Sequence, residues 1–155
     1  MACILSSDGD EIMAEIVFCE DANEELERFV ADGFEEHSAE NGTSADYNEF
    51  TFAAKDGSDI VGAVMGHAYY NEVHISELIV RKEYRGKNIG TALITAVEDR
   101  FRDRGYDHIS LTTHRFQAAG FYEKCGFTVE FIRKSRTDPK LDKYFMVNIF
   151  DKTIF

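Results

Sequence analysis

The spacing of hydrophobic residues along this 155-residue chain changes repeatedly between a strand-like and a helix-like pattern. Runs of β-branched and aromatic residues, bounded by turn residues, predict strands over residues 14–19, 50–55, 60–70, 73–80, 109–113, 127–133 and 144–150. Spacings of three and four residues predict amphipathic helices marked by residues 26–34, 89–101 and 117–125. The order β-α-β-β-β-α-β-α-β-β indicates a mixed α/β (α+β) fold.

The first twelve residues show no such period and are rich in Ser, Asp and Gly. We expect residues 1–12 to form a flexible N-terminal lead and residues 13–155 to form a single domain, since a chain of this length can bury one core. Asp21 followed by Glu24 resembles a capping box at the start of the first helix, and Gly33 is a candidate break in that helix.

The stretch from Glu77 to Phe101 combines a strand, a short basic turn and a helix. Gly86 and Gly90 bracket the turn, and Arg85 and Lys87 add positive charge to it. The first amides of a helix lack internal partners, and the helix dipole adds partial positive charge there. Glycine lets the backbone approach a ligand closely. The pattern therefore predicts a phosphate or pyrophosphate site at the start of the helix.

The composition and charge of the chain exclude several classes of function. The formal net charge of −12 argues against a nucleic-acid surface and favours a cationic partner or substrate, although acidity can also serve solubility alone. No apolar run approaches the roughly 18 residues of a membrane span, and no signal peptide is recognisable. Cys3, Cys19 and Cys125 lack metal-binding spacing, so we expect reduced thiols in a cytoplasmic protein with no metal.

Two blocks of the sequence resemble one family. Arg85-Gly86-Lys87-Asn88-Ile89-Gly90 is similar to the [QR]-x-x-G-x-[GA] loop of the Gcn5-related N-acetyltransferases (GNAT), with Asn88 where the family has Gly. Asn tolerates the left-handed backbone better than other non-Gly residues, so this difference is mild. Ala118 to Phe127 resembles the family's A-x-x-FYxxxGF block, and the resemblance extends over residues 14–150.

The resemblance implies a GNAT fold: a mixed, mostly antiparallel sheet of about seven strands, splayed at its centre and flanked by helices, with acetyl-CoA in the gap. Pantetheine is then expected along the strand before the loop, and the pyrophosphate at the loop. The residues expected to bind the cosubstrate are Leu78, Ile79, Val80, Arg85, Gly86, Lys87, Asn88, Ile89, Gly90, Thr91, Arg115, Phe121 and Tyr122.

Acetyl transfer from a thioester to an amine needs a neutral amine, a donor to the thioester oxygen and a proton for the leaving thiolate. By resemblance, the backbone amide of Val80 faces the oxygen and Tyr122 is the general acid; core packing is the alternative role for Tyr122. His74 or Glu77 is the candidate base. Strand alternation places His74 and Ser76 on one face and Glu77 on the other.

The resemblance implies that the substrate wall includes the first helix and the loop after it. This region carries Glu35 and Glu36, and His74 and Ser76 are further candidates for substrate binding. These residues predict a small cationic amine, although a solvated acidic helix face is the competing interpretation. The sequence thus predicts an acetyl-CoA-dependent N-acetyltransferase that acts by direct attack in a ternary complex. The alternative is a non-catalytic CoA-binding module of the same fold. No nucleic-acid or membrane partner is expected, and a homodimer is left open.

Overall fold

The structure of the protein, a computed structural model, describes residues 2–5 and 11–150, with side chains from residue 14 onward. The chain forms two compact units, Met1–Ser44 and Ala45–Phe155, which are described here one at a time. The flexible lead predicted over residues 1–12 lies partly outside the described residues. β1 (Ala2–Leu5) lies within this predicted lead and pairs antiparallel with β2 (Glu11–Ala14), which extends beyond it.

The helix of the N-terminal unit, α1 (Glu24–Glu40), begins two residues later than the predicted capping box implies. Asn23 is the N-cap, and its side chain accepts a 2.9 Å hydrogen bond from the amide of Leu26. Acidic residues in the first turn complement the helix dipole. The helix continues through Gly33, whose cost of about 1 kcal/mol is small against a helix of this length.

The strand predicted over residues 14–19 is wrong. The structure ends β2 at Ala14 and describes residues 15–19 as outside helix and strand. A strand needs partners for its backbone amides and carbonyls, and hydrophobic alternation alone does not supply them.

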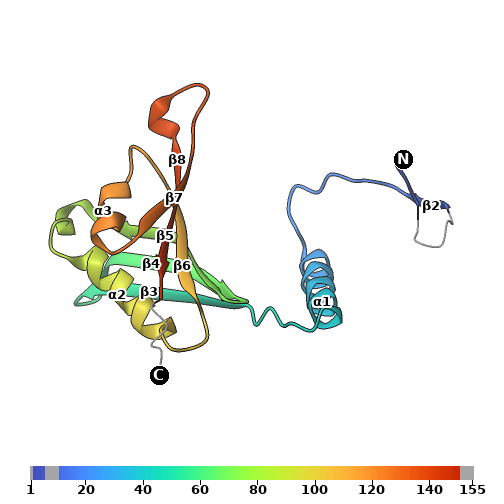
Figure 1. Cartoon of the computed structure of the whole chain (residues 1–155), viewed down its shortest axis with the longest axis horizontal. Coiled ribbons are helices and arrows are strands. Elements are labelled where there is room, and N and C mark those ends of the chain that lie inside the picture. The colour runs from blue at the N-terminus through green and yellow to red at the C-terminus, as the bar shows by residue number, and fades with distance from the viewer. Residues whose placement is uncertain (1, 6–10, 151–155) are drawn as a thin grey trace. The chain divides into compact units, whose positions relative to one another are not determined.

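The C-terminal unit is a mixed sheet with helices, shown at the left of Figure 1. The strands are β3 (Asn48–Asp56), β4 (Asp59–Tyr69), β5 (Glu72–Val80), β6 (His108–His114), β7 (Thr128–Arg133) and β8 (Lys143–Ile149). The helices are α2 (Ile89–Phe101) and α3 (Ala119–Lys124), with 3₁₀ turns η1 (Lys82–Tyr84) and η2 (Pro139–Leu141).

The strand order is β3-β4-β5-β6-β8-β7, and only the β5–β6 pair is parallel. The predicted mixed, mostly antiparallel sheet is confirmed. Among the described residues this sheet has six strands rather than about seven, because the first predicted strand is absent from it.

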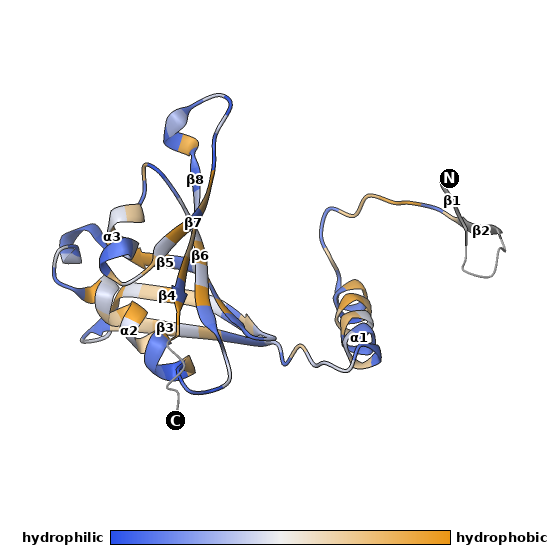
Figure 2. Cartoon of the chain, in the orientation of Figure 1, coloured by the Kyte–Doolittle hydropathy of each residue, from blue (hydrophilic) through white to orange (hydrophobic). Residues whose placement is uncertain are grey.

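The core lies between α2 and the sheet. The apolar residues of α2 that recur every three or four positions are buried: Leu93, Ile94, Val97 and Phe101. Val64, Val73 and Ile75 on β4 and β5 belong to the same hydrophobic cluster. Burial of each such side chain stabilises the fold by roughly 1.5–3 kcal/mol. The surrounding loops, such as the one between β7 and β8, are mainly hydrophilic (Figure 2).

The sheet opens at its centre, as the family resemblance implied. β5 pairs with β6 only from Glu72–Ile75 to His108–Leu111, although β5 continues to Val80 and β6 to His114. We call the space between residues 76–80 and residues 112–114 the central gap. It leaves the gap-facing edge of β5 available to an extended ligand.

A bulge on β5 lies where the gap begins. Gly66 is opposite Ile75, whereas the preceding residue on β4, Met65, is opposite Glu77, so Ser76 is the extra residue. A Cβ atom at Gly66 would collide with the backbone oxygen of His74, so the close approach of the two strands requires glycine.

No helix in the described part of the chain is long and apolar enough to cross a membrane.

Candidate functional site

The segment Arg85–Gly90, which we call the anion loop, follows η1 and includes the start of α2. Gly86 and Asn88 both have positive φ angles, 76° and 62°. Asn88 is the N-cap of α2 in the left-handed conformation, and its side chain makes no capping hydrogen bond within the described structure. The first α2 bond runs from the amide of Ala92 to the carbonyl of Asn88. The preceding amides therefore face the loop, as an anion site requires.

Gly90 is needed for packing between the two helices. A Cβ atom at this position would lie 3.0 Å from the ring of Phe121 on α3. The second block of the sequence motif therefore rests directly on the anion loop, and glycine permits that contact.

The cationic side chains of the anion loop are anchored locally. The Arg85 Nε donates to the backbone oxygen of Val80 at 3.1 Å, which ties the loop to the last residue of β5. The Lys87 ammonium lies 5.1 Å from the centre of the Tyr84 ring, and the Tyr84 hydroxyl donates to Asp56 at 2.7 Å. Arg85 and Lys87 are both exposed, so their charges remain available to a phosphate.

Tyr122 on α3 is buried, with an exposed fraction of 7%. Its ring makes edge contacts with Phe121 and Phe127, at centroid distances of 5.1 and 5.8 Å. Burial, with a smaller contribution from Cys125, raises the pKa of the phenol above its ordinary value. The hydroxyl therefore stays protonated at neutral pH. The ring takes part in core packing, and its protonated state is also the one that a general acid needs.

Cys125 follows α3. Burial is the main reason that the pKa of its thiol is raised, while a hydrogen bond with the Thr91 side chain opposes the rise. A raised pKa disfavours the nucleophilic thiolate. These observations indicate a packed thiol rather than an acyl-accepting nucleophile.

His74 lies on β5 beside the start of the central gap, and it is partly buried. Its Nδ1 is 2.8 Å from the Ser110 hydroxyl on β6, and its ring centre is 5.3 Å from that of His67 on β4. The pKa of His74 is lowered, first by burial and then by His67 and Lys143, with Glu72 and Glu77 opposing. The imidazole is therefore mainly neutral at pH 7, as a base must be.

Glu77 lies on the same face of β5 as His74, and the predicted opposite placement is wrong. The extra residue at Ser76 shifts the alternation by one position. Leu78 and Val80 consequently pack against the core, which turns Glu77 to the other face. The charge of Glu77 also acts on the pKa of His74. Both candidate bases thus face the same side of the sheet.

The remaining predicted site residues are more dispersed. The exposed Arg115 follows β6, and its amide donates to the backbone of Asp142 at 2.9 Å. Glu35 and Glu36 lie on α1, in the N-terminal unit, so the structure describes them separately from the anion loop.

Sequence reasoning missed a polar cluster on the sheet. Strand register brings together five side chains, which we call the His74 cluster: His67, Glu72, His74, His108 and Ser110. Their signal in the sequence is polar residues at alternate positions on adjacent strands, but only the register shows that these positions coincide.

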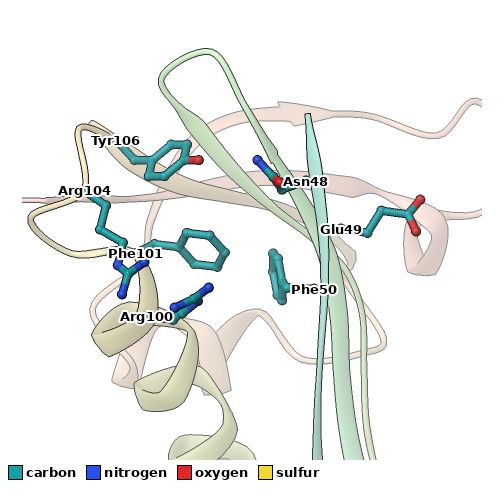
Figure 3. Close-up of a pocket in the computed structure, with 7 residues that line it drawn as sticks. All are labelled: Asn48, Glu49, Phe50, Arg100, Phe101, Arg104 and Tyr106. Carbon is teal, nitrogen blue, oxygen red and sulfur yellow. The ribbon is translucent and has the colours of Figure 1, made fainter. Parts of the chain in front are cut away.

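A second feature that sequence reasoning missed is a hollow of about 570 Å³ at the C-terminal end of α2. It is lined by Asn48, Glu49, Phe50, Arg100, Phe101, Arg104 and Tyr106. Figure 3 shows the Phe50 and Phe101 rings facing each other and the Glu49 side chain pointing away from them. The hollow is at the opposite end of α2 from the anion loop, so the two are separate features.

Comparison with known proteins agrees with the geometry. Residues 13–127 match the model of the acetyltransferase (GNAT) family. The chain is 32% identical over 78 residues to blasticidin-S acetyltransferase of Streptomyces morookaense, covering 50% of this chain and 57% of that one. It is 37% identical over 89 residues to N-alpha-acetyltransferase 30 of Schizosaccharomyces pombe, covering 51% and 57%. The matches thus span little more than half of these curated relatives.

Among solved structures, the chain resembles an acetyltransferase from Bacillus cereus with a TM-score of 0.69 and 20% identity. The alignment covers 86% of this chain and 97% of that structure. At this identity the likeness shows a shared fold.

Proposed function

Because the chain belongs to the acetyltransferase (GNAT) family, we propose that it transfers an acetyl group from acetyl-CoA to a primary amine. The observation that carries the proposal is the position of the anion loop after β5, the strand that separates from β6 at the central gap. Gly86 and Asn88 have left-handed backbone in the segment between α2 and β5, the strand that borders the central gap. The amides at the start of α2 suit the pyrophosphate of CoA, and the central gap suits its extended pantetheine arm.

In this proposal the loop residues 85–91 bind the pyrophosphate, with Arg85 and Lys87 supplying charge. The gap-facing edge of β5, residues 76–80, pairs with the pantetheine, and the amide of Val80 faces the thioester oxygen. Phe121 packs beneath the loop through its contact with Gly90. Arg115, after β6, is a second candidate contact for the phosphates.

The proposed reaction is direct attack in a ternary complex. The amine nitrogen forms a bond to the thioester carbon, and the carbon–sulfur bond breaks. The amine proton passes to His74 or Glu77, and the thiolate takes the proton of the Tyr122 hydroxyl. The neutral imidazole of His74 and the protonated phenol of Tyr122 suit these roles, because each pKa shift stabilises the form that the step requires.

We propose a small cationic amine as the acceptor. The net charge of −12, to which Glu35 and Glu36 contribute, supports this choice. Ser76 borders the central gap, and His74 lies beside its start. The names of the two relatives above refer to blasticidin S and to an alpha-amine, so a panel of acceptors needs both. Thiol release from acetyl-CoA reports turnover. Turnover only with neutral or acidic amines would contradict the cationic acceptor.

The first test is calorimetric titration of acetyl-CoA into the wild type and two variants. Arg85→Ala should weaken binding about tenfold or more, because a charge-assisted phosphate contact is lost. Arg104→Ala removes the same charge at the far end of α2 and should leave affinity unchanged. Equal affinity of the wild type and Arg85→Ala would refute the loop as the phosphate site.

The second test separates an enzyme from a non-catalytic CoA-binding module. Tyr122→Phe removes only the hydroxyl, so binding of acetyl-CoA should persist while turnover falls by about 10²-fold or more. Binding by the wild type without turnover of any amine would favour the module. Unchanged turnover in Tyr122→Phe would restrict Tyr122 to core packing.

A further inference from the structure

The His74 cluster lies on β4, β5 and β6. The parallel register places His74 opposite Ser110 and Glu72 opposite His108, and the antiparallel register places His67 opposite His74. His74 and Ser110 form the last polar pair before the β5–β6 pairing ends at Ile75 and Leu111. The cluster therefore adjoins the central gap.

The hydrogen bonds of the cluster have only one consistent direction. The Ser110 hydroxyl donates its single proton to Glu72 Oε1 at 2.7 Å. A carboxylate only accepts, so the 2.8 Å contact between Ser110 Oγ and His74 Nδ1 must have the imidazole as donor. His74 is consequently protonated at Nδ1. Its Nε2 then carries the lone pair that can accept a proton.

We propose that Ser110 and Glu72 are positioning residues that hold His74 in the Nδ1–H tautomer, so that Nε2 is the base in acetyl transfer. This inference rests on the proposed function, and it selects His74 over Glu77. Glu77 is exposed beyond the bulge, and no side-chain hydrogen bond orients it among those described. The His74 ring, in contrast, is oriented by the chain of two hydrogen bonds through Ser110.

Several charged or titratable groups surround His74. Glu72 and Glu77 are on its own strand, His67 on β4, and Lys143 on β8. His108 on β6 approaches the other Glu72 oxygen, with its Nε2 3.3 Å from Oε2. Glu72 therefore interacts with both histidines, with His74 through the Ser110 hydroxyl and with His108 directly. Removing its charge should lower the pKa of His74, because Glu72 is a group that raises it.

The test that does not depend on turnover is NMR of the full chain with ring-¹⁵N-labelled histidine, assigned with a His74→Gln variant. At pH 8 the wild type should show His74 protonated at Nδ1 and unprotonated at Nε2. Ser110→Ala should convert it mainly to the Nε2–H tautomer, and Ser110→Thr should restore the original one. Thr112→Ala, which removes a hydroxyl two residues along β6, is the matched control and should leave the tautomer of His74 unchanged.

Kinetics with an accepted amine then connects the tautomer to the reaction. Ser110→Ala should lower kcat about tenfold or more, with the KM for acetyl-CoA unchanged. In a plot of kcat against pH, the fall in kcat at low pH should reflect protonation of His74. Glu72→Gln retains an acceptor for Ser110 but loses the charge that raises the pKa of His74, so this fall should occur at lower pH. His74→Gln should abolish the fall, whereas Glu77→Gln should keep it.

Two failures are distinguishable. A wild-type His74 in the Nε2–H tautomer, or a tautomer unchanged in Ser110→Ala, would overturn the positioning role whatever the activity. A correct tautomer in a protein that turns over no amine would instead overturn the proposed function.

Discussion

At the scale of single residues, Asn88 departs from the family motif, which has glycine at this position. The structure gives Asn88 a φ of 62°, so the backbone takes the conformation that glycine adopts freely. Asn bears this conformation at a smaller cost than other non-Gly residues. The substitution therefore preserves the anion loop.

Replacement of Asn88 tests this interpretation. Asn88→Val should lower the free energy of unfolding by about 1–2 kcal/mol, because a β-branched residue is strained at positive φ. It should also weaken binding of acetyl-CoA. Asn88→Gly is the matched control and should keep or slightly raise both the free energy of unfolding and the affinity for acetyl-CoA. Urea denaturation and calorimetry measure them, and equal behaviour of the two variants would contradict the left-handed conformation.

At the scale of elements, the connection between β7 and β8 is held by one buried carboxylate. Asp142 has an exposed fraction of 2%. It accepts hydrogen bonds from the Lys134 ammonium and from the amide of Ser135, both at 2.9 Å. The hydrogen bond from Lys134 is the main reason that its pKa is lowered. The ionised form therefore stabilises the folded loop.

The pH dependence of stability follows from this shift. A carboxyl with a lowered pKa contributes stability above its unfolded pKa of about 3.9, and the contribution is lost as the pH falls through the folded value. Asp142→Asn should therefore have a lower urea midpoint than the wild type at pH 7. The difference should shrink as the pH falls below about 4 and disappear below the lowered pKa of the folded state, where the wild-type carboxyl is neutral and resembles Asn. A difference that is independent of pH would contradict the charge-based contribution.

At the scale of the whole molecule, the net charge of −12 contrasts with the basic anion loop. A cationic acceptor should be attracted by the general field, whereas an anionic cosubstrate should be attracted only by the local charges of the loop. Charge therefore affects the two proposed substrates in opposite ways.

Salt should separate these effects. With acetyl-CoA saturating, kcat/KM for a dicationic amine should fall by about 3- to 10-fold as salt rises from roughly 10 to roughly 200 mM, because the Debye length shortens from about 30 to below 10 Å. A neutral isostere of the amine should show little change. The same salt slope for both amines would contradict steering by the net charge.

Local physics made much of this fold predictable from the sequence. The four-residue period of Ile89, Leu93, Val97 and Phe101 determined the helix and its buried face, and turn residues bounded the strands of the C-terminal unit. The glycines and the basic residues 85 and 87 marked an anion loop for the same local reason. Where the prediction failed, over residues 14–19, the outcome depended on a partner strand that no local pattern specifies.

Tertiary structure alone decided the chemistry around His74. Ser110 lies 36 residues from His74 in the chain, and only the parallel register of β5 and β6 brings their side chains within hydrogen-bond distance. The bulge at Ser76 turned Glu77 to the face of His74, since one extra residue reverses the alternation that the sequence implied. Sequence thus determined most of the elements and the loop that we propose as the anion site. Register, which depends on non-local packing, decided which polar groups meet.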